Sequence, residues 1–403
     1  MGLLSLEAAV EMALRDNPGL AEMDARARAM AAIPSQAGSL PDPSLSLNAL
    51  NLPTDSFDLD QEAMTQLQVG ISQALPFPGK LGLKQEAAGY DATAAEADVG
   101  ETRLRLVRDV KTLWWTLFYL DRALEIVKQN QDLLSQFVAI AQTKFTVGEG
   151  LQQDVLLAQV EHSKMLDREI RLTGMRRVEQ ARLIALLNLS EQRIISLPGS
   201  TEQVLPQVLP QTSLSPLAET SRPLLASLRS GIEAARSRRD LAKRDYYPDF
   251  KVGAAYGFRQ GNNPDGGSRA DFASLRFSMS LPLYASSKQA KAVDQRNSEL
   301  LRKTHALRDG WLRVREEIAR AVADFQRSRD QAMLFKTGII PQANQSVASM
   351  LAGYQVDKID FLNLVSAQIT LFNHQTRYWK SFSEAHQALA RLEAAVGSEM
   401  IHE

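Results

Sequence analysis

The sequence predicts a mainly α-helical protein with a small β part, built from two equivalent units. Long proline-free runs carry apolar residues at spacings of three and four, and two pairs of short segments alternate apolar with polar residues. The chain also repeats itself about 207 residues apart, which indicates two equivalent units. Two motifs recur in both copies. The first copy has Phe145-Thr-Val-Gly148 followed by Asp154-Val-Leu-Leu-Ala158-Gln159, and the second has Tyr354-Gln-Val-Asp357 followed by Leu362-Asn-Leu-Val-Ser-Ala367-Gln368.

Composition excludes several classes of protein. The 403 residues carry a net charge of -1, so no global field would recruit nucleic acid. Cysteine is absent, which excludes disulfides, thiolate metal sites and thiol nucleophiles. The apolar run 113–120 is far shorter than the roughly 20 residues of a membrane-spanning helix. Residues 1–5 lack the basic and apolar parts of a signal peptide, as expected of a mature form or of a cytosolic protein.

The first repeat is expected to span residues 1–197. A helix should begin after Ser5 as N-cap and end at Ile33, because Pro34 follows. Alternating segments then predict a β-hairpin over 45–72. A helix from about Gly79 to Val147 would be roughly 100 Å long. Its seam of apolar residues is typical of a coiled coil. After a turn at 148–150, another helix should run to about Asn188, and the two shorter helices should stack end to end along the long one.

The second repeat, 223–397, is expected to follow the same order. Residues 198–222 are rich in proline and serine and predict an irregular connection. A helix, a β-hairpin over 250–281 and a long helix from about Lys288 should follow, with Pro341 kinking or breaking that helix. A turn at 356–360 leads to a last helix, with Gly397 as its C-cap and 398–403 as a tail.

The four strands have the pattern of tilted membrane crossings. Four strands cannot close a barrel, since the smallest membrane barrels have about 8 strands. Several copies of the chain would therefore have to contribute strands to one barrel. Aromatic residues crowd the second strand region, as interfacial girdles would. A soluble sheet that caps a helical bundle explains the same pattern equally well. In the membrane alternative, the residues expected to face lipid are Leu45, Leu47, Val69, Ile71, Val252, Leu275 and Phe277.

The twin motifs and the order helix, hairpin, long helix, turn, helix resemble the TolC family of outer-membrane efflux proteins over the whole chain. The resemblance implies a homotrimer whose barrel of about 12 strands continues into a periplasmic tunnel of helices. It also implies outer-membrane lipid around the barrel of a Gram-negative cell, a removed signal peptide, a membrane-fusion adaptor and an inner-membrane pump as partners. The turn residues expected to contact the adaptor are Gly148, Glu149, Gly150 and Asp357. Residues 73–80 and 352–365 resemble the heavy-metal branch more than the drug branch.

The same resemblance implies a gate at the helix turns. In the family, a tyrosine and an arginine of the second repeat bond to an aspartate of the first and hold the pore closed. Tyr354 matches the tyrosine and Asp154 the aspartate, but Ile359 stands at the arginine position, beside Lys358. Asn363 and Ser366 replace the aspartates that bind cations in some members, and Asp360 could supply a displaced ring. Alternatively, Asp154 and Asp360 are solvated acids that favour helix starts.

No residue pattern indicates an enzyme or a bound cofactor. Four histidines lie on helical segments without a metal-ligand spacing, and four neighbouring aromatic residues should pack between helices: His162, His305, His374 and His386, and Trp114, Trp115, Phe118 and Tyr119. The expected function is a passive trimeric exit duct of a tripartite efflux system, with heavy-metal ions from a resistance-nodulation-division pump as the suggested cargo. The alternative is a soluble coiled-coil scaffold with a small β cap.

Overall fold

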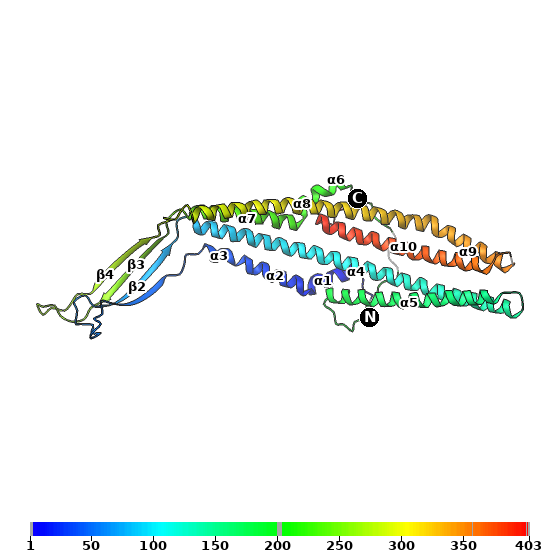
Figure 1. The fold of residues 1–403 in the computed structure, drawn as a ribbon, viewed down its shortest axis with the longest axis horizontal. Coiled ribbons are helices and arrows are strands. Elements are labelled where there is room, and N and C mark those ends of the chain that lie inside the picture. The colour runs from blue at the N-terminus through cyan, green and yellow to red at the C-terminus, as the bar shows by residue number, and fades with distance from the viewer. Residues whose placement is uncertain (1–2, 200–203, 357, 400, 402–403) are drawn as a thin grey trace. The chain divides into compact units, whose positions relative to one another are not determined.

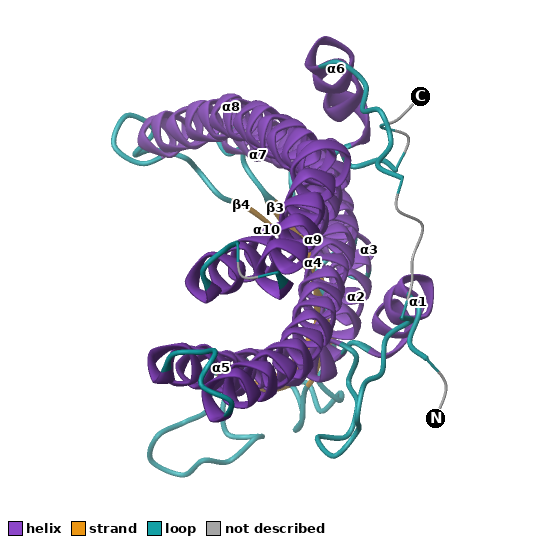
Figure 2. Cartoon of the chain, turned by 90° about the vertical axis from the view of Figure 1, so that its right-hand side faces the viewer, coloured by secondary structure: helices purple, strands orange, loops and turns teal. Residues whose placement is uncertain are grey.

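The computed structural model describes residues 3–199, 204–356, 358–399 and 401. Helices make up most of the chain, and four strands form the β part (Figures 1 and 2). Two compact units are present, one formed by residues 1–24, 98–225 and 310–403 and the other by 25–97 and 226–309. Each unit therefore draws on both sequence repeats.

The second unit holds the sheet. Its strands are β1 (Ser44–Leu50), β2 (Gln66–Leu75), β3 (Phe250–Phe258) and β4 (Phe272–Met279), paired antiparallel in the order β1-β2-β3-β4 (Figure 1). The hairpins β1–β2 and β3–β4 were both expected over 45–72 and 250–281, although β2 extends to Leu75 and β4 ends at Met279. Pairing of β2 with β3, for example Val69 opposite Tyr256, joins the hairpin of one repeat to that of the other. The helix α7 (Pro223–Arg244) leads into β3.

The remaining helices confirm most of the expected order. The predicted long helix is α4 (Lys80–Thr146), and the gaps between the other helices lie close to the expected turns. Gly397 ends the last helix with a φ of 81°, as a C-cap does. The bounds of the others are α1 (Leu6–Asp16), α2 (Pro18–Ala31), α3 (Ile33–Gly38), α5 (Gln152–Leu186), α6 (Gln211–Ser221), α8 (Gln289–Leu334), α9 (Ile340–Gln355) and α10 (Phe361–Val396).

The first predicted helix is in fact three. Ser5 caps it as expected, since its hydroxyl accepts from the Ala8 amide at 3.1 Å, but α1 ends at Asp16 and Pro18 opens α2. Pro34 lies in the first turn of α3 and does not terminate a helix. Proline fits there because the first turn of a helix leaves its N–H groups unbonded in any case.

The connection between the repeats was wrongly expected to be irregular throughout. It contains α6, which follows Pro210 and includes Pro216. Leu214 and Ala218 on this helix are fully buried, so their packing outweighs the poor helix propensity of proline.

Pro341 alters the hydrogen bonding of the helix but does not interrupt it, since α8, a π-helical segment and α9 follow one another without a gap. A π-helical segment, Phe335–Ile339, precedes α9, and Pro341 follows it in the first turn. Because proline has no N–H to donate, the widened turn before it accommodates the missing hydrogen bond.

End-to-end stacking of the short helices is confirmed in the first repeat. The Asn17 side chain donates to the Leu186 carbonyl at 2.9 Å, and the Asn188 side chain donates to the Asp16 carbonyl at 3.1 Å. The second repeat makes a related junction, where the Ser221 hydroxyl donates to the Val396 carbonyl at 2.7 Å. Hydrogen bonds from side chains to backbone carbonyls therefore hold the helix ends together at both junctions.

An aromatic cluster lies in the core of the first unit. Trp114, Trp115 and Phe118 are buried, which confirms that they pack between helices. His386 stacks on Trp115 with ring centroids 3.8 Å apart and contacts Phe382 edge-on. Burial among these rings lowers the pKa of His386 to about 4.

This histidine should make the stability of the fold depend on pH. Its pKa is about 4 in the folded state and about 6.5 when unfolded, so the unfolded state binds the proton more tightly. The contribution is fully present above pH 6.5 and falls as the pH drops toward 4, by about 3 kcal/mol in all. We expect His386→Phe to remove this pH dependence in unfolding curves recorded from pH 7.5 to 4, with the exposed His305→Gln as control. Parallel curves for wild type and His386→Phe would contradict the assignment.

Candidate functional site

The sheet has one exposed apolar face. The register places side chains in rows across the strands, such as Leu45, Ile71, Ala254 and Leu275. Leu275 is 92% exposed and Leu47 is 74% exposed. All seven residues predicted to face lipid lie on this face and are exposed: Leu45, Leu47, Val69, Ile71, Val252, Leu275 and Phe277. The structure thus brings them together on one surface.

Aromatic side chains lie at both ends of this apolar face. Phe250 and Phe277 stack with centroids 5.8 Å apart near one end, and Tyr256 meets Phe258 at 4.9 Å near the other. Such bands are typical of the two interfaces of a membrane. Phe272 is an exception, since it lies on the opposite face.

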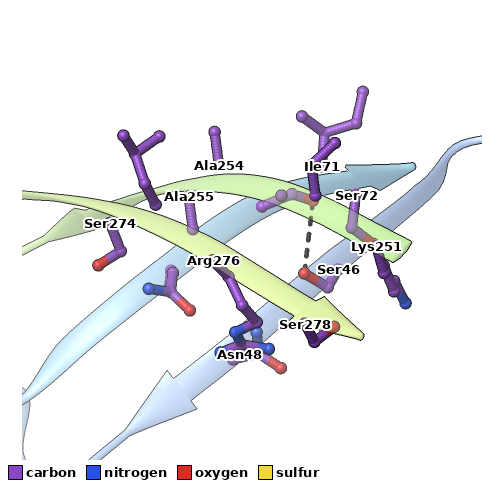
Figure 3. A pocket seen from close by; sticks show the side chains of 15 residues that line it. Ser46, Asn48, Ile71, Ser72, Lys251, Ala254, Ala255, Ser274, Arg276 and Ser278 are labelled. Atoms are coloured by element: carbon purple, nitrogen blue, oxygen red, sulfur yellow. Dashed lines mark hydrogen bonds between the residues drawn. The ribbon is translucent and has the colours of Figure 1, made fainter. Parts of the chain in front are cut away.

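The opposite face of the sheet is polar and lined by small residues. Figure 3 shows Ala254 and Ile71 on one side of the strands and Asn48, Arg276 and Ser278 on the other. A hollow of about 450 Å³ follows this polar face, which carries Ser46, Asn48, Gln68, Ser72, Lys251, Ser274, Arg276 and Ser278. The sheet therefore has one apolar face and one polar face.

A buried lysine fixes the end of the sheet from which α4 starts. The Lys80 ammonium lies 2.9 Å from the Asp249 carboxylate and 3.2 Å from that of Asp245, and it donates to the Tyr247 carbonyl. Asp249 in turn accepts from the Phe77 amide at 2.7 Å. The segment after β2 is thus tied to the segment before β3.

In the first unit, the turn between α4 and α5 needs its glycines. Gly148 has a φ of 82°, and the Glu149 amide donates to the Lys144 carbonyl at 2.9 Å, so the helix ends in a Schellman motif. A Cβ on Gly150 would lie only 2.9 Å from the Lys144 Cβ. Gly148 and Glu149 are exposed at this turn, and Asp357 of the predicted adaptor contact lies outside the described residues.

Tyr354 is a buried packing residue at the end of α9. Its ring lies 4.7 Å from the Lys144 ammonium and 5.3 Å from the ring of Phe361, which itself meets Phe137. Sequence reasoning singled out Tyr354 but missed Lys144 and Phe361. The only sequence signal for these two residues was their position next to the repeated motifs. Lys144 directly precedes Phe145, and Phe361 directly follows Asp360. The hydrogen bond from Tyr354 to Asp154 stays a prediction.

The two predicted gate acids both stand at helix starts. Asp154 is half-buried in the first turn of α5, and Asp360 is the exposed N-cap residue of α10. Burial raises the pKa of Asp154. A backbone hydrogen bond with Leu151 lowers this pKa, and the nearby Asp360 carboxylate raises it, so that the pKa remains above its usual value. Two carboxylates are thus brought close enough to repel each other.

Apolar packing occupies the place where the family has its arginine. The Ile359 side chain lies so close to the end of α9 that a Cβ on Gly353 would be 2.7 Å from its Cδ1. Lys358 is exposed, and its amide donates to the Gly353 carbonyl at 2.9 Å. The turn after α9 is therefore held by the Ile359 side chain, which packs against Gly353. Lys358 is the cation nearest in sequence to the arginine position.

The described part of the chain contains neither a membrane-spanning helix nor a cluster of metal ligands. No helix there combines the length and the apolar content that crossing a membrane requires. Within the same residues, no three histidine, aspartate or glutamate side chains converge as metal ligands would.

Comparisons with known proteins agree with this geometry. The cobalt-zinc-cadmium resistance protein CzcC of Cupriavidus metallidurans is 20% identical over 98% of this chain and 90% of its own length. The outer membrane protein VceC of Vibrio cholerae superposes with a TM-score of 0.81 at 20% identity, covering 98% of this chain and 96% of VceC. The open-state outer membrane channel MtrE of Neisseria gonorrhoeae gives 0.80 at 14% identity, covering 98% and 89%.

A family model supplies the assignment. The model described as outer membrane efflux protein matches residues 9–189 and 214–398, which is most of the chain and both repeats. The chain belongs to the outer membrane efflux protein family.

Proposed function

We propose that the protein is a passive trimeric exit duct in the outer membrane of a Gram-negative bacterium. The observation that carries this proposal is the two-faced sheet, with its exposed apolar face and its polar opposite face. An apolar face of this extent needs a covering, and lipid is the covering that suits its aromatic ends.

The edges of the sheet argue for three copies. β1 and β4 each pair on one side only, so each chain offers two open edges. An open edge cannot face lipid, because its N–H and C=O groups would be left unbonded. Four strands are too few for a barrel, whereas three copies supply about 12. The polar faces would then line a water-filled lumen.

Partners and cargo follow from the relatives. Family membership supports a periplasmic adaptor and an inner-membrane pump as partners, which would dock at the turns 148–150 and 356–360. The name of the CzcC protein supports heavy-metal ions as cargo. In this proposal the duct performs no chemistry and is opened by its partners. A soluble scaffold is the weaker candidate, because it would leave seven apolar residues of the sheet in water.

The turns would form the gate of this duct. Three copies of Asp154 and Asp360 around an axis would gather six carboxylates at one level. A phenol that donates to a carboxylate forms a charge-assisted bond worth about 1.5 to 3 kcal/mol when shielded. Tyr354 and Asp154 would thus bias the turn toward its closed form in each protomer. Ile359 adds no cation, so the closed form should be weaker than in members that keep the arginine.

Single-channel recording in planar bilayers tests the duct and the gate together. We expect the purified protein to form channels and Tyr354→Phe to raise their conductance. Adding Asp154→Ala should raise it little further, because the same link is already lost. Tyr119→Phe, a tyrosine of α4 outside the turn, is the matched control.

The two ideas fail separately. Absence of any channel from correctly folded protein would refute the duct. Channels whose conductance is unchanged by Tyr354→Phe, or fully additive effects of the two substitutions, would refute only the gate.

A further inference from the structure

The polar face of the sheet carries charge of one sign. In the four strands, all of which the structure describes, this face bears Lys251 on β3 and Arg276 on β4 and no carboxylate. Its other polar groups are hydroxyls and amides, which are neutral. The hollow along this face is therefore electrostatically positive.

These two cations differ from most basic residues near the sheet. Lys80 is held by two aspartates, and the Arg259 guanidinium donates to the Ala270 and Ala63 carbonyls. Neither Lys251 nor Arg276 forms an ion pair or side-chain hydrogen bond with any residue that the structure describes, and both are exposed. Their charge is thus uncompensated by the protein.

The register places the two cations next to each other. Arg276 lies opposite Gly253, and Lys251 lies opposite Ser278 on the neighbouring strand. They are diagonal neighbours on facing strands, at a separation of about 7–8 Å across the pair, which is within reach of long side chains. Both side chains line the hollow of about 450 Å³, together with the hydroxyls of Ser46, Ser274 and Ser278. Cations and hydroxyl donors therefore face the same space, as anion recognition requires.

We propose that this face is an anion-attracting surface that biases the duct toward small hydrated anions such as chloride. The proposal rests on the proposed function, in which the polar faces of three copies line one lumen and gather six cations. Low-dielectric walls focus the field of such charges, and rings of lysine and arginine favour anions in pores. A cation carried through this level would pass with its charge compensated by accompanying anions.

The reversal potential of bilayer-reconstituted channels in a potassium chloride gradient measures this bias. We expect Arg276→Gln and Lys251→Gln each to shift it toward the potassium equilibrium potential, and the double variant to shift it further. Arg276→Lys keeps the charge and should leave it near the wild-type value. Because carboxylates elsewhere on the chain also act on permeating ions, the informative quantity is the shift between variants.

Lys291→Gln is the matched control. It removes one positive charge from an exposed position at the start of α8, where Lys291 pairs with Asp294 at 3.1 Å. No shift in the double variant, or an equal shift with Lys291→Gln, would overturn the anion surface while leaving the duct intact. Absence of channels in the wild type would overturn both proposals. Trimer formation by each variant confirms that the compared proteins are folded.

Discussion

Arginine in place of Leu275 is expected to prevent insertion into the outer membrane, whereas arginine in place of the adjacent Ser274 should be tolerated. Leu275 is 92% exposed on the apolar face, and Ser274 lies on the polar face of the same strand. A lipid-facing arginine near the bilayer midplane costs about 2–4 kcal/mol. A symmetric trimer would bear that cost three times, which is enough to abolish assembly.

The pair of variants isolates the orientation of the side chain. Both replace one residue of β4 by arginine, so strand propensity and the added charge are matched. Fractionation of cells, followed by detection of the assembled trimer in the outer membrane, measures the outcome. Equal insertion of the two variants would show that the apolar face does not meet lipid. Equal failure would show that an arginine added at 274 is no better tolerated than one at 275, although β4 natively carries Arg276 on its polar face, and would also contradict the predicted difference between the faces.

The sequence predicted the faces of the sheet well because side chains alternate strictly along a strand. Once Leu45 and Leu47 were assigned to one face, the partners across β1 and β2 followed from the same alternation. Strand ends were predicted less accurately, because alternation does not mark where a strand stops. β2 ends at Leu75 and not at 72, and β4 ends at Met279 and not at 281. The break at Asn17 was missed although Pro18, which opens α2, is a local signal for it. The helix α6 in the connection was missed because it depends on the burial of Leu214 and Ala218, which outweighs local propensity.

The helix turns could be predicted only in part. Gly148 marks its turn through its own backbone requirement, so a single sequence reveals it. The environment of Tyr354 is different, because its partner Lys144 comes from the other repeat. No local sequence pattern predicts a contact between two residues that lie so far apart in the chain. The family resemblance identified the tyrosine but said nothing of the lysine and phenylalanine that hold its ring.

A buried ion pair joins several helices in the first unit and was not foreseen either. Arg222, between α6 and α7, binds Glu101 of α4 through two hydrogen bonds of 2.8 Å, and both side chains are almost completely buried. The same guanidinium donates to the Ala394 carbonyl of α10 and lies 3.4 Å from the Glu317 carboxylate of α8. One side chain thus contacts three helices at the start of the second repeat.

Arg222→Met should therefore destabilise the protein by about 3–5 kcal/mol, because it leaves the Glu101 carboxylate buried without its main partner. Arg105, which contacts Glu101 at 3.0 Å from a largely exposed position, can replace only part of that interaction. Arg222→Lys should fall between wild type and Arg222→Met, since an ammonium cannot make the paired contact of a guanidinium.

The double variant Arg222→Met with Glu101→Leu distinguishes an ion pair from simple packing. Removing both charges eliminates the stranded carboxylate, so the double variant should be more stable than Arg222→Met alone. Thermal unfolding of the detergent-solubilised protein, followed by circular dichroism, gives the order of stabilities. If the two substitutions add, the pair contributes no coupling and Arg222 acts through the volume of its side chain. If the double variant recovers stability, charge compensation of Glu101 is the reason for an arginine at this junction.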